Sequence, residues 1–464
     1  MRSKWLRKAL VLFLCGVVFG GCSSAPAKEA EQRSSFKIMY MDDMDESSFF
    51  QQYCDLFTMQ HPNIDIEVVS PFSIFREEVQ DYNKAFADLV EKEQPDVVLL
   101  RMDTYEKFAA EGKLLDLNTL IERDKYDLKG IYPALIEILK EKGGGKLYGL
   151  SPSFYGSALF YNADLFAKYG VEVPHDGMTW QEIIDTARRF PTDGDEKTRV
   201  YGLGSGDGGM SLESLASAIA GTQGLKYINT DTMKITLNTD AWKQVYKLAK
   251  DAIDSGTIYN PMDGGFQGGT IEAYYQSQPF LMGRMAMTSG SAYLLRSMKE
   301  AKSTLKDYKP FQVGVIAGPV DPAEPETTRD IDINEIFTIR ANSPNLDAAW
   351  EFLKFVNGEK FAKVKSRSMN NGFLSHMGIA KEYDGVNLDV FYKLKPSLDG
   401  ASSLDNDKIP RDFYAQYQPI VDRELKLVEE KKKSIEEALQ TIEQEGQVVL
   451  DKAVKEEAAK KSGE

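Results

Sequence analysis

Residues 143–166 constrain the fold more than any other stretch of this chain. A glycine-rich turn leads into a short strand, Pro152 ends that strand, and a second extended run reaches Tyr161 before Asn162 opens a helix. Two strands separated by a proline are typical of a chain that passes from one lobe to another. We therefore expect two lobes, with residues 153–155 facing a small molecule bound between them.

The first 21 residues have the pattern of an export signal. A positively charged start precedes the apolar run 9–19, and small residues precede Cys22. This resembles the lipobox of bacterial lipoproteins, although Phe19 replaces the usual leucine. We expect Cys22 to be lipidated and residues 22–35 to form a flexible tether to the membrane. A retained anchor helix and a plain secretory signal remain the alternatives.

Cysteine usage agrees with this interpretation. Cys15 leaves with the signal and Cys22 carries lipid, so Cys54 alone remains and no intramolecular disulfide is possible. Cys54 lies among apolar residues at helical spacing, which predicts a buried structural thiol.

The charge of the chain excludes some partners. The sequence has 71 acidic residues against 56 Lys and Arg, for a formal net charge of -15, and removing the basic leader makes the balance more acidic. We therefore expect no nucleic-acid partner. The length exceeds the roughly 250–300 residues that one hydrophobic core supports, which again favours two lobes.

The N-terminal part alternates strands and helices. We expect strands at 36–41, 64–69 and 95–100, a helix from about Glu46, and a helix at 74–92. This alternation predicts a doubly wound α/β lobe, in which ligands bind beyond the carboxyl ends of the strands.

Several polar residues occupy such strand ends. The ligand-binding candidates there are Asp42, Asp43, Asp103 and Tyr105. Helix N-capping explains any one of these carboxylates equally well.

The second half repeats the α/β pattern. Thr179 and Trp180 begin a capping-box helix, with ligand stacking by Trp180 as the alternative. The glycine-rich run 201–209 lacks the lysine of a phosphate loop and is interpreted as a turn beside the cleft. Ser289 and Tyr293 lie where a strand meets a helix, so both are ligand-binding candidates.

Two further segments are predicted to cross between the lobes. The strand 311–319 ends in Gly-Pro, and the loop 366–375 offers Asn371 and Phe373 to the cleft. We interpret the Lys/Glu-rich stretch from about Arg423 as a solvated packing helix.

These crossings give a domain division. The N-terminal lobe comprises 36–153 plus 319–367, and the C-terminal lobe comprises 154–318 plus 368–464.

Six short motifs occur in a family-specific order along about three quarters of the chain after its leader. They are residues 61–69, 95–97, 145–162, 179–180, 283–287 and 348–355. With them the chain resembles the family 1 extracellular solute-binding proteins of ABC importers, the group that includes maltose-binding protein. The resemblance implies a two-lobe, type II periplasmic-binding-protein clamp that closes on a sugar or oligosaccharide and presents it to permease transmembrane subunits.

The resemblance also assigns roles by position. Asp103 occupies the position where the family has a carboxylate that binds sugar hydroxyls, and Tyr293 occupies the position of an aromatic residue that stacks on the sugar. Tyr155 falls where maltose-binding protein has an acidic contact, and Leu100 where an aromatic is frequent. These two departures argue against malto-oligosaccharides in particular. We expect a monomer on the extracellular face of the cell membrane.

Sugars present apolar C–H faces to aromatic rings and hydroxyl edges to polar groups, so a mixed cleft suits them. The stacking candidates are Tyr105, Tyr155, Tyr293 and Phe373.

Two other functions stay open. A secreted glycoside hydrolase needs a carboxylate pair, which 71 acidic residues supply by chance. The sequence holds neither G-x-S-x-G nor H-E-x-x-H, and with three histidines we expect no metal, no cofactor and no catalysis. A lipoprotein that senses ligand without transport is the second alternative.

Overall fold

The computed structural model describes residues 33–41, 44–72, 74, 82–195, 198–205, 209–261, 266, 268–397 and 408–462. The leader, Cys22 and the candidates Asp42 and Asp43 lie outside these residues.

The N-terminal lobe is built on a five-stranded sheet with the order β2-β1-β3-β14-β4. Its strands are β1 (Ser34–Tyr40), β2 (Ile64–Val69), β3 (Val97–Leu100), β4 (Gly149–Leu150) and β14 (Ile336–Ile339). β1 pairs in parallel with β2 and β3, while β14 returns antiparallel to β3 and β4. The doubly wound lobe predicted from the sequence is confirmed, with one antiparallel strand added from a distant part of the chain.

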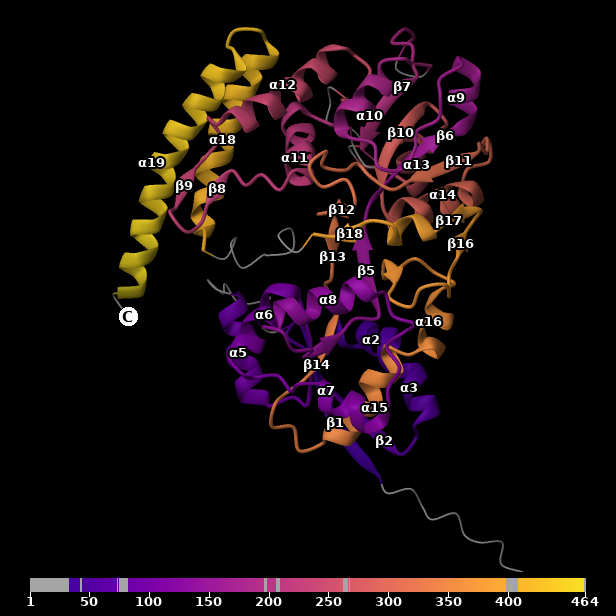
Figure 1. Cartoon of the computed structure of the whole chain (residues 1–464), viewed down its shortest axis with the longest axis vertical. Helices are drawn as coiled ribbons and strands as arrows, with labels where there is room; N and C mark the ends of the chain where they lie inside the picture. The colour runs from indigo at the N-terminus through magenta and orange to yellow at the C-terminus, as the bar shows by residue number, and fades with distance from the viewer. Residues whose placement is uncertain are drawn as a thin grey trace, which may run out of the picture.

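Helices cover both faces of this sheet (Figure 1). They are α2 (Glu46–Phe49), η1 (Phe50–Cys54), α3 (Asp55–Gln60), α5 (Tyr82–Glu93), α6 (Met102–Ala110), α7 (Asn118–Asp124), α8 (Pro133–Lys142), α15 (Leu346–Val356) and α16 (Glu359–Lys365). Aromatic rings fill the space between helices and sheet: Phe352 lies 5.2 Å from Phe36 and 5.1 Å from Phe57, centroid to centroid. Such pairs add to the free energy gained from burying apolar area.

The helix expected from Glu46 begins there, with Asp45 as its N-cap. It does not continue as one α-helix, because the π-helical turn η1 interrupts it. The expected buried thiol is confirmed: Cys54 is fully buried, and burial raises its pKa to about 12.

The C-terminal lobe has a four-stranded sheet with the order β11-β6-β10-β7. The strands are β6 (Ala158–Asn162), β7 (Tyr201–Ser205), β10 (Met285–Gly290) and β11 (Val313–Ile316). The prediction of a turn at 201–209 is therefore wrong for residues 201–205, which pair in parallel with β10. Glycines at alternate positions hid the strand pattern, since they leave no side chains to alternate.

Helices and short hairpins complete this lobe. The helices are α9 (Ala163–Tyr169), α10 (Trp180–Ala187), α11 (Leu212–Thr222), α12 (Asp240–Asp254), α13 (Ile271–Ser277), α14 (Ala292–Thr304), α18 (Arg411–Glu429) and α19 (Ile435–Ser462); the small pairs are β8 (Ile228–Asn229) with β9 (Lys234–Ile235), and β16 (Glu382–Tyr383) with β17 (Val386–Asn387).

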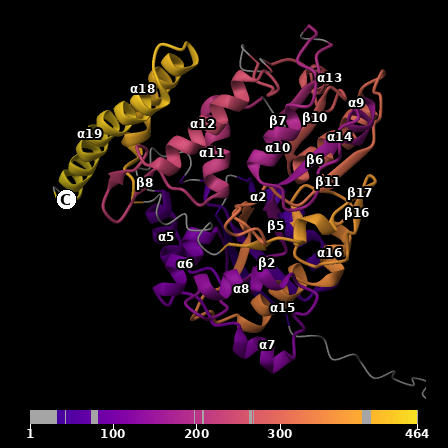
Figure 2. The same cartoon turned by 45° about the horizontal axis from the view of Figure 1, so that its top comes forward.

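The C-terminal stretch differs from its prediction. Instead of one solvated helix from about Arg423, α18 and α19 form an antiparallel hairpin that packs on α12 and β9 (Figure 2). Tyr417 of α18 stacks on Tyr227 at 5.8 Å, and Glu424 is buried as an ion pair with Arg423 and Lys433. A buried apolar stripe that includes Leu439, Ile442 and Ala453 fixes the hairpin to the lobe.

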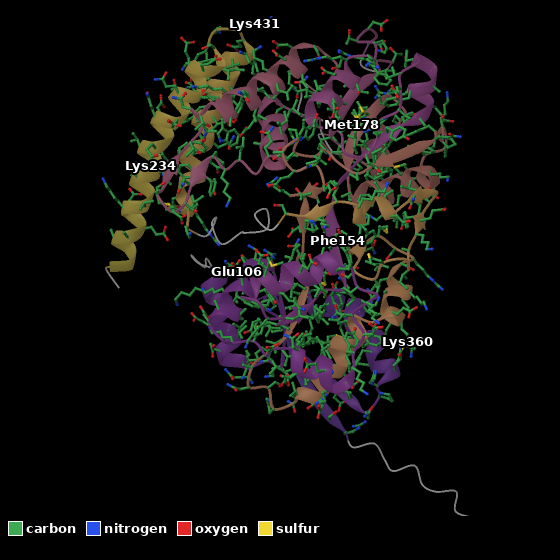
Figure 3. All side chains as sticks on the ribbon, viewed as in Figure 1. Glu106, Phe154, Met178, Lys234, Lys360 and Lys431 are labelled. Atoms are coloured by element: carbon green, nitrogen blue, oxygen red, sulfur yellow. The ribbon has the colours of Figure 1, made fainter. Side chains whose placement is uncertain are left out.

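A small three-stranded sheet lies between the lobes. The strand β5 (Ser153–Gly156) is at its centre, paired antiparallel with β13 (Ile331–Asp332) on one side and β15 (Phe373–Leu374) on the other. β5 and β15 belong to the crossings expected at 153–155 and 366–375, whereas β13 lies beyond the expected crossing at 311–319, in a stretch that has the composition of a loop. The segments that contain β5, β13 and β15 are called the first, second and third interlobe segments, and the second comprises residues 319–335. Phe154 lies between the two bodies (Figure 3), beside β12 (Thr327–Thr328), β18 (Lys395–Pro396) and η2 (Asp389–Tyr392).

No helix within the described residues is long and apolar enough to cross a bilayer.

The burial of a thiol and of two phenol groups predicts that the folded protein loses stability at high pH. Burial raises the pKa of Cys54, Tyr126 and Tyr132 to about 12 each, from ordinary values of 9.0 for the thiol and 10.0 for the phenols. At pH 9–12 the unfolded chain releases protons that the folded chain keeps. The free energy of unfolding should therefore fall by about 1.4 kcal/mol per pH unit for each group.

Urea unfolding at pH 8 to 11 checks this. Tyr126→Phe should flatten the fall above pH 10, whereas Tyr169→Phe, which changes an exposed ring, should leave it unchanged. A free energy that stays constant over this range would contradict the expectation.

Candidate ligand-binding site

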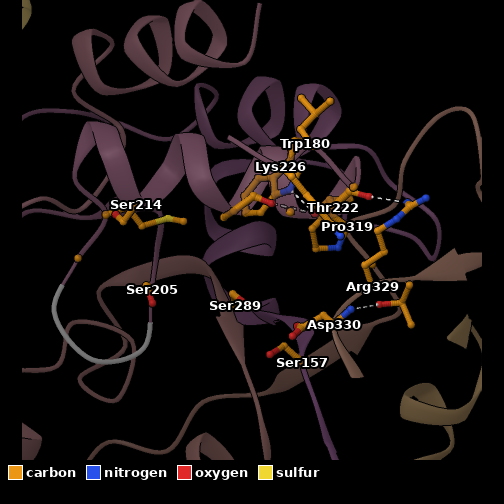
Figure 4. Close-up of a pocket in the computed structure, with 18 residues that line it drawn as sticks. Ser157, Trp180, Ser205, Ser214, Thr222, Lys226, Ser289, Pro319, Arg329 and Asp330 are labelled. Atoms are coloured by element: carbon orange, nitrogen blue, oxygen red, sulfur yellow. Dashed lines mark hydrogen bonds between the residues drawn. The ribbon is translucent and has the colours of Figure 1, made fainter. Parts of the chain in front are cut away.

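The strand ends of the C-terminal lobe bring serine hydroxyls together. Ser205 ends β7 and is the register partner of Ser289 on β10, while Ser157 immediately precedes β6. Figure 4 shows the three serines along one side of a pocket. Within the described residues, no hydrogen bond occupies any of the three hydroxyl groups, so each is available to a ligand.

The pocket has a volume of about 490 Å³. α11 forms one wall, with Ser214 and Thr222, and the second interlobe segment forms another, with Pro319 and Asp330. Met210 and Pro319 add apolar surface to the hydroxyl groups. The volume lies in the range of about 300–1,000 Å³ that is typical of small-molecule sites.

Hydrogen bonds hold these two walls together at Thr222. Trp180 Nε1 donates to Thr222 Oγ1 at 2.9 Å, and Arg329 Nη1 donates to the Thr222 carbonyl at 3.0 Å. Arg329 also pairs with Glu324 at 2.9 Å and Asp321 at 3.7 Å, both in the second interlobe segment. The arginine thus fixes the end of α11 to the chain that runs between the lobes.

Trp180 lines this pocket, but only 6% of it is exposed. The predicted capping box of Thr179 and Glu182 at the start of α10 is confirmed. The indole packs behind the pocket wall and its N–H is already bonded, so the structure favours packing over ligand stacking for this ring.

Tyr293 lies four residues beyond Ser289, in the first turn of α14. It is 42% exposed, and its hydroxyl lies 3.3 Å from that of Tyr274. The guanidinium of Arg296 covers the ring at 5.0 Å. The structure therefore leaves Tyr293 at the surface near the pocket, outside its lining.

Asp103 and Tyr155, two further predicted contacts, lie outside the lining of this pocket. Asp103 is half-buried in the first turn of α6. This helix lies on the edge of the N-terminal lobe that faces the other lobe, where Figure 3 labels Glu106. The Oδ1 atom of Asp103 accepts from the Thr104 amide at 2.7 Å, and Oδ2 has no bonding partner within the described residues. Tyr155 is half-buried on β5, opposite Asp332.

Two of the predicted contacts are wrong because the residues are in the core. Tyr105 is fully buried, and its hydroxyl donates to the Leu139 carbonyl at 2.8 Å. Two residues apart on a helix, Asp103 and Tyr105 point to nearly opposite faces. Phe373 is 1% exposed and stacks on Phe391 at 3.8 Å, so it serves the packing between lobes.

Asn371 is half-buried, and its side-chain amide is used within the protein. Nδ2 donates to Glu335 at 3.2 Å and to the Tyr53 hydroxyl at 3.3 Å. Of the seven predicted residues that the structure describes, Ser289 alone lines the pocket of Figure 4.

Sequence reasoning missed most of the pocket. Ser205 lies in the glycine-rich run that the sequence analysis interprets as a turn beside the cleft, so its region was found but not its place in the pocket lining. Thr222 and Arg329 are 107 positions apart, and no local pattern connects them.

Comparison with known proteins decides the family. The sequence pattern described as "Bacterial extracellular solute-binding protein" matches residues 42–363. The chain belongs to this family.

Individual relatives agree at lower identity. The arabinooligosaccharide-binding protein of Bacillus subtilis is 23% identical over 363 residues, which cover 77% of this chain and 76% of that protein. A putative binding protein of Brucella abortus is 29% identical over 231 residues, and the match spans 50% of this chain and 51% of that relative. The chain thus aligns with only about half the length of the Brucella relative.

Solved structures show the two-lobe fold of the family. An ABC substrate-binding protein of Listeria monocytogenes in complex with cycloalternan has a TM-score of 0.54 at 19% identity, covering 89% of this chain and 98% of that one. A family 1 extracellular solute-binding protein of Alicyclobacillus acidocaldarius has a TM-score of 0.61 at 15% sequence identity, and the match covers 91% of this chain and 100% of that one. A Rhizobium etli sugar transporter in an open conformation has a TM-score of 0.59 at 20% sequence identity, and the match covers 89% of this chain and 98% of that one.

Gly224 tests how the pocket wall is built. Its backbone has φ +68°, and an added Cβ would lie 2.7 Å from Arg329 Nε. Gly224→Ala should lower the free energy of unfolding by roughly 1–3 kcal/mol, because it strains the backbone and displaces Arg329.

Gly221→Ala is the matched control. This glycine lies within α11 with open space around its Cβ position, so alanine should raise stability by roughly 0.5–1 kcal/mol. Urea denaturation measures both variants, and equal effects at the two positions would contradict the assignment of Arg329 to the wall.

Proposed function

We propose that this protein binds a sugar or oligosaccharide between its lobes and delivers it to the permease of an ABC importer. The observation that carries the proposal is the row of hydroxyl groups on Ser157, Ser205 and Ser289 in a pocket of about 490 Å³, which have no hydrogen-bond partner among the residues that the structure describes. Hydroxyl groups both donate and accept, as sugar hydroxyls do, so they match a neutral polyhydroxylated ligand better than a charged one.

The opposite side of the ligand would meet the N-terminal lobe. Asp103 offers a carboxylate oxygen without a bonding partner in the described residues, and Tyr155 offers a half-buried ring on β5. Tyr293 would extend the contact from the C-terminal lobe, with Asp42 and Asp43 as further candidates at the end of β1. Closure of the lobes would then bring both sets of groups onto one ligand.

Relatives support a carbohydrate. The Bacillus subtilis relative is named for arabinooligosaccharides, and the Listeria monocytogenes structure holds cycloalternan. Other structures of the same fold hold maltose, D-mannitol or tagatose. Since these ligands differ in size and linkage, they support the class and leave the particular sugar open.

The leader supports membrane attachment. With Cys22 lipidated, a short tether would hold a monomeric clamp on the extracellular face of the cell membrane, where permease subunits can receive the ligand. A sensor that binds the same ligand without transport would use the same anchor.

A glycoside hydrolase is the weaker alternative. Retaining and inverting glycosidases both need two carboxylates about 5–10 Å apart around the scissile bond. Among the described residues, the pocket lining contributes one carboxylate, that of Asp330. We therefore propose binding without cleavage.

A thermal-shift screen of the purified protein tests the function. The sugars are arabinotriose, cycloalternan, maltose, D-mannitol and D-tagatose. A sugar at about 100 times its dissociation constant should add about 2.7 kcal/mol to the stability of the folded state and raise Tm. No shift with any carbohydrate, or release of cleaved sugar on prolonged incubation, would contradict the proposal.

The serine row is tested by removing its hydroxyls. Ser205→Ala and Ser289→Ala should each cost about 0.5–1.5 kcal/mol of binding energy for a sugar found in the screen, a roughly 2- to 12-fold rise in Kd. Ser303→Ala, which changes an exposed serine on α14 away from the pocket, should leave the Kd unchanged. Equal Kd values for all three variants in calorimetric titration would exclude the row from the site.

A further inference from the structure

One carboxylate connects all three segments that run between the lobes. Glu335 immediately precedes β14, at the N-lobe end of the second segment. Its Oε2 accepts from Ser153 Oγ at 2.9 Å, and its Oε1 accepts from Asn371 Nδ2 at 3.2 Å. Ser153 opens β5 in the first segment and Asn371 precedes β15 in the third, so the three segments meet at a single side chain.

Tyr53 attaches this junction to the N-terminal lobe. Its ring is 2% exposed, and its hydroxyl accepts from Asn371 Nδ2 at 3.3 Å and from Gln52 Nε2 at 2.7 Å. Burial, the negative charge of Glu335 and a hydrogen bond to Glu335 all raise the pKa of Tyr53 well above its ordinary value. The phenol therefore stays protonated and donates to the carboxylate.

The local backbone around Tyr53 is unusual. The residue lies in η1, a single π-helical turn between α2 and α3. Such turns are rare and often occur at functional sites, because the extra residue redirects the side chains near it. Here the turn carries the Tyr53 hydroxyl that Glu335 binds.

Lys365 balances part of the charge. Its ammonium group lies over the Tyr53 ring at 5.6 Å and over the Phe361 ring at 5.2 Å. Burial lowers its pKa, and the attraction of Glu335 opposes that shift. A positive charge on α16 thus lowers the cost of holding the Glu335 carboxylate among partly buried groups.

The junction reaches one candidate ligand contact. Ser153 and Tyr155 are two residues apart on β5, so their side chains lie on the same face of the strand. The electrostatic interaction of Tyr155 with Tyr53 is among the causes of the raised Tyr53 pKa, which places the two phenols near one another.

We propose that Glu335 is a positioning residue that holds the three interlobe segments in register on the N-terminal lobe, and with them Tyr155. Its two oxygens are bonded within the protein, so it acts through β5 and β15 and does not contact ligand. The effect on ligand affinity rests on the proposed function; the effect on the interlobe strands does not.

Hydrogen–deuterium exchange of the purified protein tests the proposal without ligand. Glu335→Gln puts an amide group where the carboxylate accepts hydrogen bonds, which should loosen the pairing of β5 and β15. The rate of amide hydrogen exchange in peptides covering these two strands should rise by about 10-fold or more. Peptides covering β7 and β10 should keep their wild-type rates. Glu326→Gln, an exposed change in the same interlobe segment, is the matched control and should alter neither set.

A polarity swap separates positioning from general damage. Asn371→Asp alone places two carboxylates together and should also raise exchange at β5 and β15. The double variant Glu335→Gln, Asn371→Asp restores one donor opposite one acceptor, so both strands should return towards wild-type rates. Unchanged exchange in Glu335→Gln, a uniform rise across both lobes, or no rescue in the double variant would overturn the proposal.

Arabinotriose titration supplies the second readout. If this sugar binds the wild-type protein, Glu335→Gln should weaken the affinity for it at least 5-fold, and the double variant should recover that affinity. An unchanged affinity in Glu335→Gln would overturn the proposed coupling of Glu335 to the ligand site. If the sugar does not bind, the proposed ligand class is at fault, and the exchange result still decides the role of Glu335.

Discussion

The structure depends on how β5 is paired. Two α/β lobes can move relative to one another only through the chain segments that join them, and a lone extended segment between them would leave its N–H and C=O groups without partners. β5 avoids this by pairing with β13 on one edge and β15 on the other. The first, second and third segments thus become one small sheet, and the lobes keep a defined relation to each other.

This central sheet also explains why the proposed site is divided. The serine row and the wall formed by α11 belong to the C-terminal lobe, while Asp103 belongs to the N-terminal lobe, and β5 with Tyr155 lies between them. Arg329 attaches the second segment to α11, and Glu335 attaches the other end of that segment to β5 and to the loop before β15. The second segment therefore has a polar anchor in each lobe, and a change in the angle between lobes must act on both anchors.

Local sequence patterns predicted the parts of the fold that local energetics decide. The start of the helix at Glu46, the capping box at Thr179 and the buried run 97–100 depend on residues within a few positions of each other. The crossing after Pro152 was also predictable, because proline ends a strand whatever surrounds it. The chain length and the strands separated by Pro152 predicted two lobes, and the family resemblance supplied their arrangement as a type II clamp.

The candidate site was predicted less well, for reasons that single residues show. Tyr105 and Phe373 have the composition of sugar-stacking residues, but which face of α6 or of β15 meets the core is set by packing. Ser205 lies on a strand that its neighbouring glycines concealed. The contact of Arg329 with the Thr222 carbonyl and the convergence of Ser153, Glu335 and Asn371 arise only when distant segments are brought together.

The central claim is that two lobes joined by β5 close on a ligand seated at the serine row. Small-angle X-ray scattering with and without a saturating sugar measures this most directly. The account predicts a smaller radius of gyration with the sugar than without it, and no such change in a variant that lacks the Ser205 and Ser289 hydroxyls at the same sugar concentration. A radius of gyration that is the same with and without a sugar known to be bound would contradict it.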